Sequence, residues 1–171
     1  MNTKLLYIIK ELSKSTYPCK KALQKTIYLI QKKGVNLGFD YSIHYYGPYS
    51  SKLDNSLYSL VMTGMLDIDK SSRGHTIRLI DEEIIDNVFL QEEKEKIKEV
   101  LDAFPIQSAF ELEVITTTDF VANNTSDNDE NIILEEVKAI KGEKFTDEKI
   151  KNAVSVLKEQ GYWKKETVSS C

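Results

Sequence analysis

The chain has 171 residues, of which 41% are hydrophobic and 29% charged, with a formal net charge of −4. This length suits one domain, or a small domain with a helical extension, and the apolar share can bury a core without disulfides or metals. The charge is uneven, because residues 1–80 carry 12 basic and 5 acidic side chains, and residues 81–171 carry 11 and 22. Three explanations stay open: a basic half that meets a polyanion, two halves that attract each other, or lysines that only solvate helices.

Cysteine usage and hydropathy both argue against a secreted protein and against a membrane protein. The two cysteines, Cys19 and Cys171, form no disulfide framework and no metal-binding spacing, which suits a reducing compartment. No run approaches the roughly 18 to 20 apolar residues that span a bilayer. We therefore expect a cytoplasmic protein without a membrane partner.

Two helices are predicted first. Residues 3–14 place apolar side chains at positions 5, 8, 9 and 12, which is helical spacing. Pro18 breaks this segment, since proline lacks a donor and disfavours helical geometry in the residue before it. Residues 19–33 form the second helix and end at Gly34, a typical C-terminal glycine.

A short extended piece around Ile43 to Tyr46 follows, and its aromatic and β-branched residues favour a strand. Ser50 or Ser51 then caps a third helix that Gly64 ends. Its buried stripe is Leu53, Leu57, Leu60 and Val61. After it, "MLDID" and "HTIRLI" flank the turn "KSSRG" and predict a β-hairpin.

The remaining segments are predicted to form helices. Residues 81–103 predict one long charged helix that Phe104-Pro105 ends. The segment "QSAFELEVITTTDFVANN" predicts another, with Phe110, Val114 and Phe120 as partial core. Residues 129–141 and 146–160 complete the chain, the latter capped by Thr146.

This order favours one fold. Helix, helix, short strand, helix and hairpin is the order of a winged helix-turn-helix, in which the hairpin forms the wing. The predicted fold is mainly α with a small β-hairpin, made of a winged-helix-like domain at 1–80 and an acidic helical extension at 81–171 packed on it.

A winged helix that binds DNA uses the outer face of its third helix and its wing. The candidate nucleic-acid-binding residues of this kind are Ser51, Lys52, Asn55 and Ser59 on the helix, Lys70, Arg73 and His75 on the wing, and Lys20, Lys21 and Lys25 around the start and outer side of the second helix. Against this interpretation, the third-helix face carries one cation and Asp54 near its edge would repel a phosphate. A solvated face explains the second-helix lysines equally well.

Tyrosines are concentrated in the first 60 residues, and they flank the Gly47-Pro48 break that leads into the third helix. Tyrosine is amphipathic, so copies left exposed suit a protein interface or stacking on a base. The candidate protein-interface residues are Tyr45, Tyr46, Tyr49 and Tyr58.

The sequence offers little for catalysis. His44 and His75 are the only histidines, and neither has a metal-ligand spacing. No nucleophile motif or glycine-rich phosphate loop is present. We expect His44 to be a packed strand residue, and we expect no enzyme, no metal and no cofactor.

The segments "LQKTIYLIQ" on the second helix and Tyr46-Gly47-Pro48-Tyr49-Ser50 before the third resemble those of YwgA-like uncharacterised winged-helix proteins. More distantly, the chain resembles the SocA-like (Panacea-domain) antitoxins. The resemblance implies a winged-helix-like core with added helices. For the antitoxin relatives it implies neutralising a toxin by direct contact, in some cases with transcriptional regulation.

The sequence thus predicts a non-enzymatic macromolecular-binding protein, antitoxin-like or regulatory. Its partner is either a protein, such as a toxin or defence protein, or double-stranded DNA. A DNA-binding regulator, a phage or mobile-element protein that inhibits a host or defence protein, and a homodimer formed through the C-terminal helices stay open as alternatives.

Overall fold

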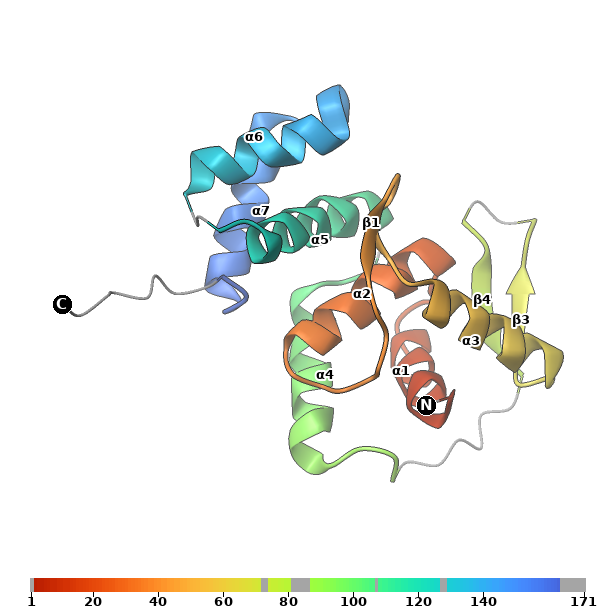
Figure 1. Cartoon of the computed structure of the whole chain (residues 1–171). Coiled ribbons are helices and arrows are strands. Elements are labelled where there is room, and N and C mark those ends of the chain that lie inside the picture. The colour runs from red at the N-terminus through yellow and green to blue at the C-terminus, as the bar shows by residue number, and fades with distance from the viewer. Residues whose placement is uncertain (1, 72–73, 81–86, 107, 127–128, 164–171) are drawn as a thin grey trace.

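A computed structural model describes residues 2–71, 74–80, 87–106, 108–126 and 129–163. Within these residues the chain is mainly helical (Figure 1), with α1 Asn2–Ser13, α2 Lys20–Lys32, α3 Ser51–Met62, α4 Gln91–Ala103, α5 Ala109–Asn124, α6 Glu130–Lys141, the 3-10 helix η1 Gly142–Lys144 and α7 Asp147–Glu159. Two antiparallel two-stranded sheets accompany them, β1 Ser42–His44 with β2 Gly47–Tyr49, and β3 Leu66–Asp69 with β4 Thr76–Leu79. The predicted mainly helical class is confirmed.

The N-terminal helices form as their apolar spacing predicts. The predicted stripe of α1 is buried, and the α3 stripe is buried at Leu53, Leu57 and Leu60. Ser50 is the N-cap of α3, because its hydroxyl accepts a hydrogen bond from the amide of Leu53. Strand β3 packs on α3 and β4 packs on α1.

The C-terminal helices pack on the N-terminal ones. Helix α5 contacts α2, and it also contacts α6 and α7 (Figure 1). The main apolar core runs from Leu5 to Leu112, and a second core of α5 to α7 includes Val114, Val137 and Phe145. The domain boundary predicted after residue 80 stays a prediction, and the main core extends across it.

The fourth helix is shorter than predicted at its N-terminal end. Residues 81–86 lie outside the described residues, and α4 begins only at Gln91. Phe89 packs edge-on against Tyr7, with ring centroids 5.3 Å apart. The carboxylate of Glu93 accepts a hydrogen bond from the backbone amide of Leu90 at 2.9 Å. The buried ring and this cap fix the helix start later than the charge pattern indicated.

Burial along α5 follows expectation at Val114 but differs at two other places. Phe110 is exposed by 37%, whereas Thr116, Thr117 and Thr118 are fully buried. Thr116 and Thr118 donate to the carbonyls four residues earlier, at 2.7 and 2.9 Å. These two hydroxyls are therefore satisfied within the helix at core positions, whereas the buried hydroxyl of Thr117 has no hydrogen-bond partner among the described residues.

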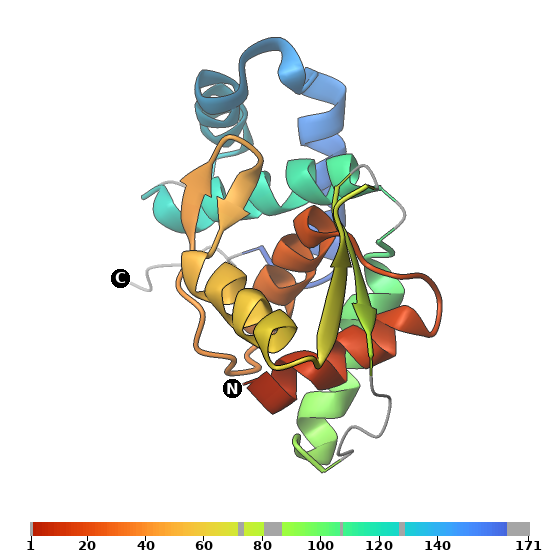
Figure 2. The ribbon, with the colours of Figure 1, turned by 90° about the vertical axis from the view of Figure 1, so that its right-hand side faces the viewer.

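The expected extended piece is a complete hairpin, β1–β2, with Tyr45 and Tyr46 at its turn. Figure 2 shows this hairpin at the left, pointing toward α6, and the β3–β4 sheet at the right. No helix in the described ranges is long and apolar enough to cross a membrane.

Candidate functional site

Strand β2 packs on α5, and Gly47 lies at this contact. Gly47 has a φ of +85°, and a Cβ built there would sit 2.8 Å from Thr117 Oγ1 and 3.3 Å from Glu113 Cγ. A left-handed backbone and a contact this tight both require glycine. The start of β2 is therefore held in one position against α5.

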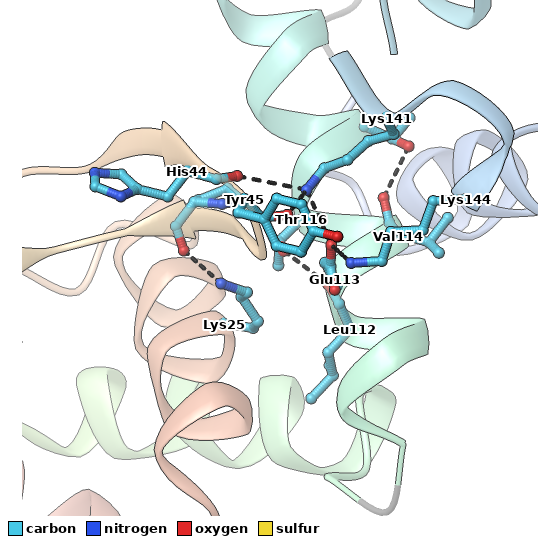
Figure 3. Close-up of polar contacts among 11 residues, drawn as sticks. Lys25, His44, Tyr45, Leu112, Glu113, Val114, Thr116, Lys141 and Lys144 are labelled. Carbon is cyan, nitrogen blue, oxygen red and sulfur yellow. Dashed lines mark hydrogen bonds and ion pairs between the residues drawn. The ribbon is translucent and has the colours of Figure 1, made fainter. Parts of the chain in front are cut away.

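Two lysine side chains anchor the same hairpin from different sides (Figure 3). Lys25 Nζ donates to the carbonyl of Pro48 at 2.6 Å, and Lys141 Nζ donates to the carbonyl of Tyr45 at 2.6 Å. Lys25 is only 2% exposed. The two ammonium groups thus bind the backbone on both sides of the turn.

Glu113 of α5 compensates these buried cations. One of its carboxylate oxygens accepts hydrogen bonds from Lys141 Nζ at 2.9 Å and Lys144 Nζ at 2.6 Å. Desolvation by burial lowers the pKa of Lys25 to about 8, and the Glu113 charge opposes that shift. Burial likewise lowers the pKa of Lys141, again opposed by Glu113. The negative charge of Glu113 therefore offsets part of the free-energy cost of burying these charged lysines.

The anchored turn presents two tyrosines, Tyr45 and Tyr46, which we call the tyrosine tip. Tyr45 is 77% and Tyr46 45% exposed, and their rings meet edge to face at 4.9 Å. Lys21 Nζ lies 3.5 Å from the Tyr46 ring centroid, and Lys144 Nζ lies 5.1 Å from that of Tyr45. These are cation–π distances, so the tip is an aromatic surface bordered by positive charge.

Beside the tip lies a pocket of about 470 Å³. Its walls come from the start of α2, hairpin β1–β2, and the residues that lead into β4. The pocket is lined by the basic side chains of Lys20, Lys21, Lys25 and His75 and by the aromatic rings of His44, Tyr45, Tyr46 and Tyr49. We call it the lysine–tyrosine pocket, because these two residue types make up half of its lining, which also includes Asp54.

The far wall of this pocket is also pinned. The amide of Lys20 donates to the carbonyls of Gly74 and His75 at 3.2 and 3.1 Å, and a Cβ on Gly74 would meet Cys19 Cβ at 3.3 Å. His75 adopts a φ of +59°, a left-handed conformation that costs a non-glycine residue energy. Packing against the start of α2 therefore holds the His75 backbone in a strained state.

The structure brings together predicted residues that the sequence had placed in two separate groups. Lys20, Lys21, Lys25 and His75, expected on nucleic acid, share the pocket with Tyr45, Tyr46 and Tyr49, expected on a protein. Lys25 is buried instead of lying on the outer side of its helix. Asp54 forms an ion pair with Lys20, so its charge is compensated.

Other predicted residues lie elsewhere. The exposed outer face of α3 carries Ser51, Lys52, Asn55, Tyr58 and Ser59. Lys70 is exposed just after β3, and Arg73 lies outside the described residues. His44 was expected to be packed, but it is exposed, with its ring centroid 4.9 Å from that of Tyr49.

Sequence reasoning missed Glu113, Lys141 and Lys144. Each lies far along the chain from the hairpin, and no periodic pattern pairs residues 28 or 31 positions apart. The one available signal was the position of Glu113 between Leu112 and Val114, because an acid flanked by core residues needs a buried partner.

Chemically, the arrangement can hold an anion and stack a planar group, but it has no constellation for metal chemistry. No group of three or more histidine, cysteine, aspartate or glutamate side chains suited to a metal occurs in the part of the chain that the structure describes. No protein-family model matches this sequence, and a search of curated proteins also finds no match.

Proposed function

We propose that this chain is a non-enzymatic binding protein, antitoxin-like or regulatory, that contacts a partner protein through the tyrosine tip. The carrying observation is that Tyr45, 77% exposed, sits on a turn whose backbone is anchored by Lys25 and Lys141. Aromatic residues are enriched at protein interfaces, and exposed apolar patches mark interaction sites.

Rigidity supports this proposal. A binding loop that is already fixed loses little conformational entropy on association, so more of its contact energy appears as affinity. Gly47 packed on Thr117 and the two lysine anchors fix the hairpin before any partner arrives. The tip is thus a preorganised pair of aromatic anchors.

Charge indicates the kind of partner. Five lysines lie around the tip and pocket, Lys20, Lys21, Lys25, Lys141 and Lys144. Among them Lys20 is paired with Asp54, and Lys141 and Lys144 are paired with Glu113. These seven residues leave a surplus of three positive charges. The proposed partner surface is therefore acidic, since complementary potentials favour encounter and register.

The proposed scaffold is a winged helix with helical additions. Helices α1 to α3 precede the β3–β4 hairpin, β3 packs on α3 and β4 on α1, as a wing would. The resemblance to YwgA-like proteins and SocA-like antitoxins agrees with this arrangement. On this proposal the partner is a toxin, or a host or defence protein.

Site-specific photocrosslinking tests the proposal. A photoreactive phenylalanine analogue replaces Tyr45 in one variant and Tyr58, on the exposed α3 face, in a matched control. We expect a discrete adduct from position 45, and the purified adduct protein should lose at least tenfold in affinity for the Tyr45→Ala/Tyr46→Ala variant. An affinity unchanged by those two substitutions would sink the proposal.

DNA binding is the second candidate function, favoured by the exposure of Lys52, Asn55 and Ser59 along one face of α3. In a winged helix this face enters the major groove, where Asn can read adenine and Lys can reach guanine or phosphate. Lys52, Arg73 and the lysines at the start of α2 would each neutralise a phosphate and release counterions, so the affinity for DNA should fall steeply as salt rises.

Fluorescence anisotropy with a labelled mixed-sequence duplex tests this candidate from low to moderate salt. The Lys52→Glu/Arg73→Glu variant should abolish binding if α3 and the wing contact DNA. Glu92→Gln, an exposed change on α4, serves as the matched control. Absence of binding by the unaltered protein at low salt retires DNA as the partner.

A further inference from the structure

We propose that the lysine–tyrosine pocket binds a nucleoside phosphate, with the phosphate at Lys21 and His75 and the base against the aromatic wall. This inference goes beyond the proposed function and does not rest on it. The proposed partner contacts the exposed tip, whereas this ligand lies in the pocket between the two hairpins.

The basic wall provides the phosphate end. Lys21 Nζ faces the pocket against the Tyr46 ring, and Lys25, beneath the pocket, adds a buried positive charge. Across from them stands His75, an imidazole that can donate to phosphate. Ammonium-to-phosphate hydrogen bonds are charge-assisted and about twice as strong as neutral ones.

His75 gives an independent reason to assign a ligand here. Its left-handed φ of +59° is a strained state that the contacts at Gly74 and Lys20 maintain. Strain of this kind is concentrated at ligand-binding positions. Both histidines of the chain, His44 and His75, line this one pocket although they are far apart in sequence.

The opposite wall and the size of the pocket argue for a base in addition to a phosphate. His44, Tyr46 and Tyr49 present aromatic rings. A base can stack on such a ring whatever its identity, because every base has a π-face. A volume of about 470 Å³ lies within the range of small-molecule sites and leaves room beyond a lone inorganic anion.

Isothermal titration calorimetry on the full chain tests the site with AMP, GMP, CMP and UMP. Adenosine and inorganic phosphate serve as half-ligands. We expect at least one nucleotide to bind at least tenfold more tightly than either half-ligand, because only it uses both walls. A short 5′-phosphorylated single strand forms a second arm that distinguishes a free nucleotide from a strand end, which presents the same chemistry.

Variants locate the ligand. Lys21→Ala should weaken nucleotide binding at least tenfold, and His75→Gly should weaken it severalfold, with glycine chosen because it tolerates the left-handed backbone. The matched control Lys52→Ala, an exposed lysine outside the pocket, should bind as the unaltered protein does. Urea unfolding of each variant shows that it is folded.

Three outcomes would overturn the inference. They are no binding heat from any nucleotide at millimolar concentration, inorganic phosphate binding as tightly as the nucleotide, or Lys52→Ala weakening binding as much as Lys21→Ala. None of these results bears on crosslinking from position 45, so failure here is distinguishable from failure of the proposed partner surface.

Discussion

Glu113 and Lys141 form a buried ion pair, Oε1 to Nζ 2.9 Å, in which both side chains are less than a tenth exposed. This pair joins α5 to the end of α6, and the same ammonium holds the carbonyl of Tyr45. The contact therefore connects the C-terminal helices to the backbone of the tyrosine tip.

Glu113→Gln should destabilise the protein strongly. The substitution keeps the shape but leaves the Lys141 ammonium buried without its carboxylate, and breaking a buried pair from one side costs about 3–5 kcal/mol. Urea unfolding measures this. Glu111→Gln, an exposed neighbour on the same helix, should change the free energy of unfolding by less than about 0.5 kcal/mol. Equal effects of the two variants would show that the pair contributes nothing.

Gly47→Ala should destabilise the hairpin through a specific clash. The new Cβ would lie 2.8 Å from Thr117 Oγ1, in addition to the left-handed strain of about 1–2 kcal/mol. Gly38→Ala carries the same kind of strain with open space around it, so it should cost less. Thermal unfolding compares them.

The double variant Gly47→Ala/Thr117→Ala provides the decisive control for that clash. Thr117 Oγ1 is buried without a hydrogen-bond partner, so removing it loses no hydrogen bond and frees space for the new methyl group. We expect part of the stability lost in Gly47→Ala to return. Strict additivity of the two substitutions would contradict the contact.

Lys25 should make stability rise between pH 8 and pH 10. Burial lowers the pKa of Lys25 from 10.5 to about 8, so in this interval the unfolded chain binds a proton that the folded chain has released. The penalty of a buried charge applies below pH 8 and is relieved as the pH rises, by an amount on the order of 2 kcal/mol.

The free energy of unfolding should be measured at pH 7, 8, 9 and 10 for the unaltered protein and for Lys25→Met. As pH rises, the free energy of unfolding of the unaltered protein should increase relative to that of the variant, because methionine has no proton to release. Parallel profiles would show that Lys25 does not titrate in this range.

Tyr28→Phe should weaken the junction of α2 with α5. The Tyr28 hydroxyl donates to Asp119 Oδ2 at 2.6 Å in the core, and a hydrogen bond to a charged group contributes about 1.5–3 kcal/mol. Tyr58→Phe, at an exposed position, is the control and should be neutral. Chemical unfolding with both variants measures the difference. A Tyr28→Phe variant as stable as the control would show that this bond is dispensable.

Local patterns predicted much of the secondary structure. Apolar spacing predicted α1, α2 and α3, and the glycine and serine signals placed their ends to within a few residues. The predicted start of α4 was wrong because a tertiary contact, Phe89 against Tyr7, helps to set where the helix begins. Residues 87–90 carry no charge, and Glu93, whose side chain accepts a hydrogen bond from the Leu90 amide, is a local signal for this start that the charge pattern did not take into account.

The sequence by itself determined the helical class, the β3–β4 hairpin, the tyrosines around Gly47 and the lysines at the start of α2. Those features depend on residues within a few positions of one another, where periodicity, caps and turn residues act. Only the tertiary structure decided that Lys25 is buried, that Glu113 and Lys141 hold the hairpin, and that His44 and His75 line one pocket. These contacts join segments that are distant in the sequence. Their energies come from desolvation and charge pairing, which depend on how the helices pack and not on residues that are adjacent in the sequence.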